Sequence, residues 1–224
     1  MRSFLFVVGI SFFTPIFFAC SLARLPTVSD ERIERLVGDE GFKILQVTRD
    51  KDAASRYQFL LSDFPRKDIF GLTGGSRRIY VSYDLARRAA SHAGYRWQLR
   101  QTLAHEIAHE LSGHAESKNE NSFNASAEGG GITAADLGLP GNIRFYPYSL
   151  EKELEADLNG MKYWSALGWD CRIWVDLLEA FVTLEYTGDI HHPTDQRLAQ
   201  ALRACPAGRP TGPLASLGST DHRQ

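Results

Sequence analysis

Residues 96–113 read RWQLRQTLAHEIAHELSG, and this stretch decides the fold prediction. Its apolar residues recur every three to four positions, which predicts a long helix that ends at Gly113. At about 100° per residue, one side of this helix is apolar and is formed by Leu99, Leu103, Ile107 and Leu111. The other side is polar and carries His105 and His109. The helix therefore has a core face and a separate face suited to chemistry.

The segment His105-Glu106-Ile107-Ala108-His109 places two imidazoles four residues apart. Four residues are about one helical turn, so both rings point to one face and can share a metal ion. Glu106 lies about 100° around the helix from His105, close enough to accept a proton from water at that metal. Two incidental surface histidines would have the same spacing, so the motif alone does not establish a metal site.

A second predicted helix, residues 149–167, carries acidic residues in or beside its apolar face. These are Glu153 and Asp157, and the apolar face itself is marked by Leu150, Leu154, Leu158 and Met161. Burying an unpaired carboxylate is costly, so such residues need a cation or hydrogen-bond donors. Two histidines, a glutamate and a water form a common catalytic zinc site, which predicts one zinc ion per chain on His105, His109 and Glu153. An ordinary buried ion pair is the alternative interpretation of the acids.

Together, the two motifs resemble the gluzincin zinc metallopeptidase family that contains HtpX, BepA and LoiP (metallopeptidase family forty-eight). The segment Glu153-Leu154-Glu155-Ala156-Asp157 is similar to the Glu-x-x-Ala-Asp motif of that family. The resemblance extends over about residues 69–202 and includes Gly74-Gly75, the strand 79–82, His114 and the segment His192-Pro193 followed by Arg197. Among the departures, Thr73 stands where Pro is common and Phe70-Gly71 stands where Asn-Ala is common.

The resemblance implies a zincin-like metallopeptidase domain in which Glu153 is the third zinc ligand. Asp157 would stand behind the ligands and accept a hydrogen bond from one imidazole, which we expect to be His105. Glu106 would act as the general base. We expect His192 to stabilise the developing oxyanion or to bind zinc at rest; the alternative is a helix N-terminal histidine without a catalytic part. His114 is expected to be structural and to face away from the ligands.

The rest of the chain predicts an α+β fold, with a small β-sheet packed on a helical bundle. Helices are expected at residues 29–37, 83–93, 171–186 and 194–204, and strands at 42–48, 57–61 and 78–82. A peptide substrate could add to the last strand if its edge is open; the alternative is a paired interior strand. Residues 116–148 predict a flexible loop, interpreted either as a lid over the metal or as a disordered insertion.

The N-terminal residues 1–19 have the pattern of a signal peptide, because the apolar run is too short to span a bilayer. Cleavage before Cys20 would give a lipoprotein acylated on that cysteine, cleavage after Ala23 would give a soluble secreted protein, and an uncleaved anchor is a third possibility. Either cleavage leaves Cys171 and Cys205 as a candidate disulfide, with two buried thiols as the alternative. The metallopeptidase domain would then span residues 24–205, followed by a disordered tail at 206–224.

The formal net charge of −2 excludes a globally basic nucleic-acid binder. We therefore predict a periplasmic zinc metalloendopeptidase, anchored to the outer membrane through lipid on Cys20, that cleaves unfolded or misassembled envelope proteins for quality control. One alternative is a zinc-dependent chaperone or assembly factor for outer-membrane proteins with little proteolysis, and another is a zinc hydrolase of non-peptide substrates. Retention of Glu106 favours the peptidase, since a pure binder would not need that residue.

Overall fold

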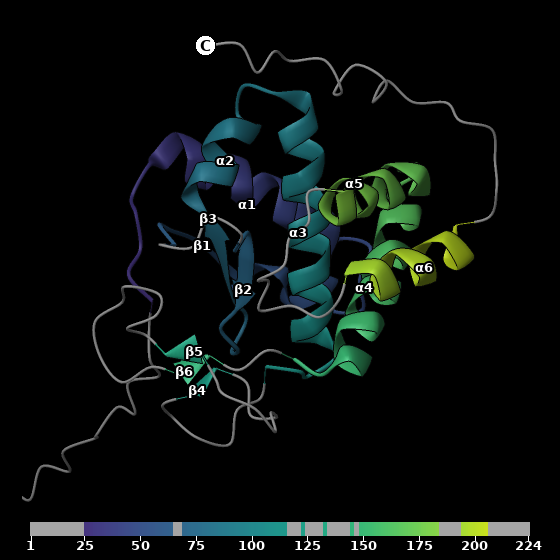
Figure 1. Ribbon diagram of the computed structural model, residues 1–224. Helices are drawn as coiled ribbons and strands as arrows, with labels where there is room; N and C mark the ends of the chain where they lie inside the picture. The colour runs from purple at the N-terminus through teal and green to yellow at the C-terminus, as the bar shows by residue number, and fades with distance from the viewer. Residues whose placement is uncertain are drawn as a thin grey trace, which may run out of the picture.

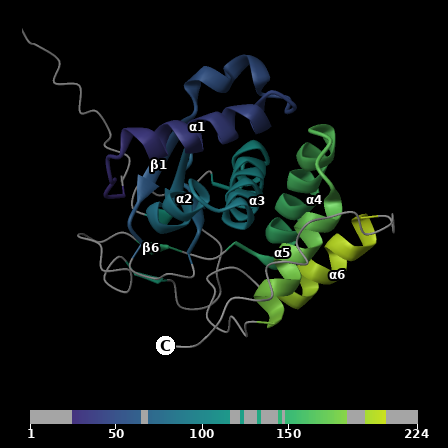
Figure 2. The ribbon, with the colours of Figure 1, turned by 90° about the horizontal axis from the view of Figure 1, so that it is seen from above.

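The computed structural model describes residues 25–64, 69–115, 122–123, 132–133, 144–145, 148–183 and 194–205. They form an α+β fold whose central element is the helix α3 (Ala93–Leu111). This helix packs against α1, α2, α4, α5, β2 and β3, and it separates the sheet with α1 and α2 from α4 and the later helices (Figures 1 and 2). The helix predicted from the HEIAH motif is confirmed. Its polar face is buried as well as its apolar face, because neighbouring elements cover both.

The main sheet has three strands, β1 (Gln58–Ser62), β2 (Gly71–Thr73) and β3 (Arg78–Ser82), in the order β1-β3-β2. β3 pairs in parallel with β1 and antiparallel with β2, and all five of its residues are buried. The hypothesis that a peptide adds to β3 is therefore wrong, because both edges of this strand are already paired. β2, which the sequence analysis did not identify, is the strand next to α3.

The helix α1 (Glu31–Leu45) occupies part of the segment 42–48 that was predicted as a strand, and that prediction is wrong. The side chain of Asp30 accepts a hydrogen bond from the Ile33 backbone N–H and so begins the helix. Buried residues then recur at helical spacing up to Ile44 and Leu45, which pack into the core. The apolar residues of 42–48 fit a strand period as well as a helix period, and the upstream cap and packing select the helix.

The other predicted helices are present: α2 (Tyr83–Ala89) and α4 (Leu150–Ala166) are shorter than predicted, and α6 (Thr194–Ala204) has the predicted bounds. α5 (Cys171–Thr183) begins where predicted and is described up to Thr183. A short 3-10 helix, η1 (Lys51–Arg56), precedes β1. The predicted disulfide between Cys171 and Cys205 is confirmed, and it joins the start of α5 to the residue after α6. Within the described ranges, no helix combines the length and the apolar character that a membrane crossing requires.

The segment 116–148 contributes three short strands, β4 (Ser122–Phe123), β5 (Ile132–Thr133) and β6 (Arg144–Phe145), in the order β4-β6-β5. Apart from these strands and Tyr148, the segment interpreted as a lid lies outside the described residues. The same holds for the signal peptide (1–19) with Cys20 and Ala23, for His192, and for the tail 206–224.

Candidate metal centre

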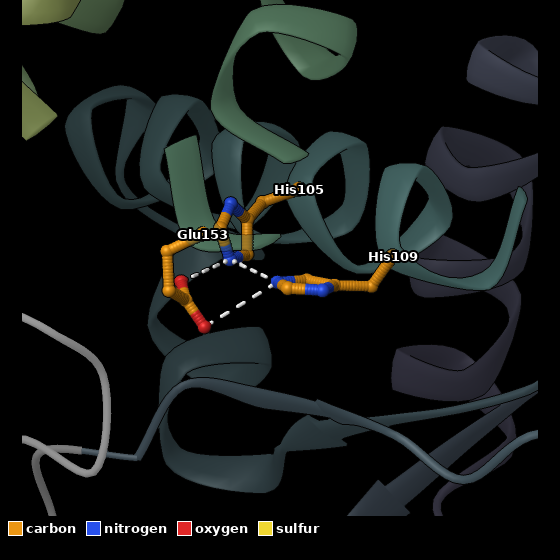
Figure 3. Close-up of side chains that lie close together, drawn as sticks. All are labelled: His105, His109 and Glu153. Atoms are coloured by element: carbon orange, nitrogen blue, oxygen red, sulfur yellow. Dashed lines mark hydrogen bonds and ion pairs between the residues drawn. The ribbon is translucent and has the colours of Figure 1, made fainter. Parts of the chain in front are cut away.

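Two helices that are far apart in sequence bring three metal-ligating side chains together (Figure 3). His105 and His109 come from α3 and Glu153 from α4, and each is at most 5% exposed. The Nε2 atoms of the two histidines lie 3.0 Å apart. The Glu153 carboxylate oxygens lie 3.1 Å from His105 Nε2 and 3.5 Å from His109 Nε2. These three residues form a buried group that could hold a metal ion.

The local sequence explains why Glu153 faces α3. The side chain of Ser149 accepts a hydrogen bond from the Lys152 backbone N–H and begins α4, which places Glu153 in the first turn of the helix. One turn later, Asp157 follows on the same side. Further along α4, Gly160 lies beside the backbone of Ala104, so the two helices approach closely next to His105.

Behind the three ligands, Asp157 and Arg197 fix the orientation of His105. His105 Nδ1 lies 2.9 Å from Asp157 Oδ1, which is the contact that the sequence analysis expected for Asp157. Arg197 from α6 donates to both oxygens of Asp157, at 2.7 and 2.8 Å, and lies 3.8 Å from Glu153. If Nδ1–H donates to Asp157, the lone pair of Nε2 points toward the other ligands. Arg197 belongs to a segment that resembles the family, but the sequence pattern alone predicts no role for it.

His114 contacts His109, a candidate metal ligand, so the expectation that it faces elsewhere is wrong. Its Nδ1 lies 2.9 Å from His109 Nδ1, and its Nε2 lies 3.4 Å from Glu155 Oε2. Gly113 has a positive φ of 71°, and the chain reverses there so that the His114 backbone N–H donates to the His109 carbonyl. A helical projection continued past Gly113 therefore gives the wrong direction for this ring.

Tyr148 covers the other side of His109. The two rings are stacked, with centroids 3.9 Å apart and planes 15° apart, and Tyr148 is 3% exposed. This tyrosine is the last residue of the segment that the sequence analysis interpreted as a lid. The stacking of Tyr148 on His109 places the end of this segment against the candidate metal site.

Glu106, the predicted general base, is buried at the contact between α3 and β2. It is 2% exposed, and its Oε2 accepts a hydrogen bond from the Thr73 hydroxyl at 2.7 Å. Gly71 lies on the same strand and leaves room for the Glu106 side chain. Thr73 is a contact that the sequence analysis missed, since a single threonine in a short strand carries no pattern.

The two imidazoles differ in their affinity for a proton. Burial and Arg197 lower the pKa of His105, but hydrogen bonds to Asp157 and Glu153 outweigh them and raise that pKa to about 9. Burial lowers the pKa of His109 to about 3, so this ring stays neutral. The Glu153 carboxylate lies 3.1 Å from His105 Nε2, so a cation between them would balance its buried charge. Metal binding at this place would displace any proton on the two imidazole Nε2 atoms.

The geometry of the group fits a small tetrahedral cation. Metal–nitrogen and metal–oxygen bonds of about 2.0–2.2 Å in a tetrahedron place neighbouring ligand atoms roughly 3.3–3.6 Å apart. The separation of 3.5 Å lies in this range, and the separations of 3.0 and 3.1 Å are slightly shorter. The three predicted ligands, His105, His109 and Glu153, thus lie close enough together to share one ion. Glu106, the predicted general base, directly follows His105 in the sequence.

No model of a known protein family matches this sequence, and no curated protein matches it either. The residues themselves therefore carry the functional argument.

Proposed function

We propose that this chain is a zinc metalloendopeptidase with a zincin-like fold, of the gluzincin type. The single observation that carries the proposal is the buried group of His105, His109 and Glu153, with a glutamate directly after the first histidine. Two imidazoles and one carboxylate are the protein ligands of many catalytic zinc sites, which keep the fourth position open. A bound zinc ion would supply Lewis acidity that polarises a carbonyl and lowers the pKa of water.

The roles of the protein residues follow from their positions. Glu106 accepts the proton of the attacking water and passes it to the leaving amine nitrogen. Asp157 and Arg197 hold His105 with Nε2 directed inward. His192 remains a proposed catalytic residue near the developing oxyanion, and it lies outside the described residues.

The strand β2 supports a polypeptide as the substrate. In the part of the chain that the structure describes, β2 pairs with β3 along one edge, and we propose that its other edge takes a substrate strand by backbone hydrogen bonds. A Cβ atom on Gly71 would lie 3.0 Å from Glu106 Cγ, so a strand added beside β2 would run close to the general base. Backbone pairing is tolerant of side chains, and this suits unfolded or misassembled proteins.

The Cys171–Cys205 disulfide supports an oxidising compartment, in agreement with the proposed periplasmic location. Attachment to the outer membrane through lipid on Cys20 remains part of the proposal. Electrophoretic shift and mass of the envelope protein, with Cys20→Ser as the control, test this attachment.

Cleavage of casein by the full chain, expressed with its own N-terminal segment and purified from the envelope, tests the function. We expect about one zinc per chain and measurable cleavage in the wild type. Glu106→Gln should keep the zinc and the fold and lose activity by at least about 100-fold, because only the proton transfer is removed. Glu153→Ala should lose most of the zinc. A wild type that binds zinc and suppresses aggregation of an unfolded outer-membrane protein without cleaving it would instead indicate the chaperone alternative.

A further inference from the structure

We propose that Thr73 is a positioning residue for Glu106: its hydroxyl holds one carboxylate oxygen and leaves the other to take the proton. This inference rests on the proposed function, because it assigns Glu106 the role of general base. Thr73 Oγ1 lies 2.7 Å from Glu106 Oε2 and 2.9 Å from the Glu106 carbonyl oxygen. Both residues are buried, at 3% and 2% exposure.

The single hydroxyl proton of Thr73 goes to the carboxylate. The Glu106 carbonyl lies inside α3, where backbone carbonyls accept hydrogen bonds from the residue four positions later. A carboxylate is the stronger acceptor, and a hydrogen bond to an ionised group is about twice as strong as a neutral one. The geometry therefore assigns the proton to Oε2.

The backbone around Thr73 is fixed by the sheet. Thr73 pairs with Ile79 of β3, and β3 is buried and paired on both sides. A β-branched side chain has few χ1 rotamers, so a fixed backbone fixes the hydroxyl as well. The base is thus tied to a paired strand of the sheet rather than to a loop.

Gly71, two residues earlier on the same face of β2, shapes the space around the other carboxylate oxygen. A Cβ atom there would lie 2.6 Å from Thr102 Cγ2, 3.0 Å from Glu106 Cγ and 3.4 Å from Glu106 Oε1. In the described part of the chain, Oε1 has no hydrogen-bond partner. The strand thus anchors Oε2 and leaves Oε1 for the proton.

A glutamate side chain has three rotatable bonds, and fixing one of its oxygens reduces the rearrangement needed in the transition state. The effect should therefore appear in kcat rather than in KM. A purely structural hydroxyl, which only holds β2 on α3, would change stability and leave kcat unchanged.

The test compares Thr73→Val, which removes only the hydroxyl, with Thr73→Ser, which restores it. Thr48→Val is the matched control, because Thr48 is also buried and its hydroxyl donates to the Leu45 carbonyl, near the end of α1. With a quenched fluorescent peptide, we expect Thr73→Val to keep one zinc per chain and to lose roughly 10- to 100-fold in kcat, with little change in KM. Thr73→Ser and Thr48→Val should keep kcat within about threefold of the wild type.

A double-mutant cycle in urea, on metal-free protein, measures the contact without activity. Thr73→Val should lower the unfolding midpoint in the wild type and much less in Glu106→Leu, where the acceptor is gone. The role of Thr73 would be overturned if Thr73→Val had the kcat of the wild type, or if Thr73→Ser lost as much kcat as Thr73→Val. It would also be overturned if the changes in unfolding midpoint caused by the Thr73 and Glu106 substitutions simply added. A zinc-loaded wild type with no peptidase activity would overturn the proposed function and this role together, while a coupled cycle would still show the contact.

Discussion

Arg197 of α6 donates two hydrogen bonds to Asp157 of α4, from Nε to Oδ2 at 2.7 Å and from Nη2 to Oδ1 at 2.8 Å. Burial raises the pKa of Asp157, but Arg197 and His105 outweigh it and hold that pKa well below its usual range. The ionised carboxylate then accepts from His105 Nδ1. Three helices thus meet behind the candidate metal centre: α3 brings His105, α4 brings Asp157 and α6 brings Arg197.

Replacing Arg197 by Met should weaken both the fold and the metal site. The variant leaves Asp157, which is 1% exposed, buried without its guanidinium partner. Breaking a buried pair in this way costs about 3–5 kcal/mol of unfolding free energy, and loss of such a supporting contact lowers metal affinity by about 10- to 100-fold. Urea unfolding and zinc competition with a fluorescent chelator measure the two effects. Arg203→Met, at an exposed position of the same helix, is the control and should change neither the unfolding free energy nor the zinc affinity. If Arg197→Met bound zinc as tightly as the wild type, the role given to the Arg197–Asp157 pair would be wrong.

The disulfide should stabilise the same region from the other end of α6. Cys171 and Cys205 are separated by 34 residues, and closing a loop of this length contributes about 3–4 kcal/mol in the chain-entropy model. We expect the double variant Cys171→Ser, Cys205→Ser to lose about this amount in urea unfolding. Dithiothreitol should lower the unfolding free energy of the wild type to that of the double variant, and it should leave the unfolding free energy of the variant unchanged. Equal stability of oxidised wild type and variant would show that the bridge does not constrain the chain.

The candidate metal site was predictable because its pattern is local. Two histidines one turn apart share a face of any helix, and an acid such as Glu153 in an apolar stripe must meet a cation or donors wherever the helix packs. The disulfide was predictable because two cysteines, Cys171 and Cys205, remain for pairing once Cys20 is removed or acylated. By contrast, the apolar residues of 42–48 fit both periods, and the choice depended on the distant Asp30 cap and on tertiary packing.

The supporting contacts were not predictable because they depend on how the elements pack. The direction of His114 is set by the positive φ of Gly113, where the helical projection no longer applies. Thr73 stands where the resembled family commonly has Pro, and this departure by itself predicts no role for the side chain. Its contact with Glu106 requires the register of β2 on β3 and the position of the sheet beside α3, neither of which has a local signal.

His114 should raise the metal affinity of the site through His109. If His109 binds metal through Nε2, its Nδ1–H donates to His114 Nδ1, and His114 Nε2–H points to Glu155. His114→Ala removes this acceptor, and we expect zinc affinity to fall by about 10- to 100-fold. His92→Ala, at the exposed N-terminal cap of α3, is the matched control. Equal zinc affinities in the two variants, measured by chelator competition, would exclude this support.

The Asp50 carboxylate should contribute stability that depends on pH. Burial raises the pKa of Asp50, but hydrogen bonds from Tyr57 and Arg77 outweigh it and lower that pKa below its ordinary value. A lowered carboxyl pKa gives stability that is present above about pH 4 and is lost as the pH falls further. Because the pair is partly exposed, Asp50→Asn should cost only about 0.5–1 kcal/mol at pH 7. Urea unfolding at pH 7, 5 and 3.5 should show this difference shrinking only at the lowest pH; a difference that grows there would contradict the sign.

Gly160 should be required for the close approach of α4 to α3. A Cβ atom at this position would lie 2.6 Å from Trp174 Cη2 and 3.4 Å from the Ala104 carbonyl, and Trp174 is fully buried. Gly160→Ala gains about 1 kcal/mol of helix propensity, but overpacking against a rigid indole costs about 1–3 kcal/mol.

We therefore expect Gly160→Ala to have a net loss of stability and a weaker zinc affinity, because α4 carries Glu153 and Asp157 on the displaced side. Gly38→Ala in α1 is the matched control, since among the described residues its new Cβ would meet only the Phe42 ring, at 3.7 Å. That variant should gain about 0.5–1 kcal/mol and leave the metal affinity unchanged. If Gly160→Ala is stabilised like Gly38→Ala, or binds zinc as tightly as the wild type, the crossing of α3 and α4 does not depend on this glycine.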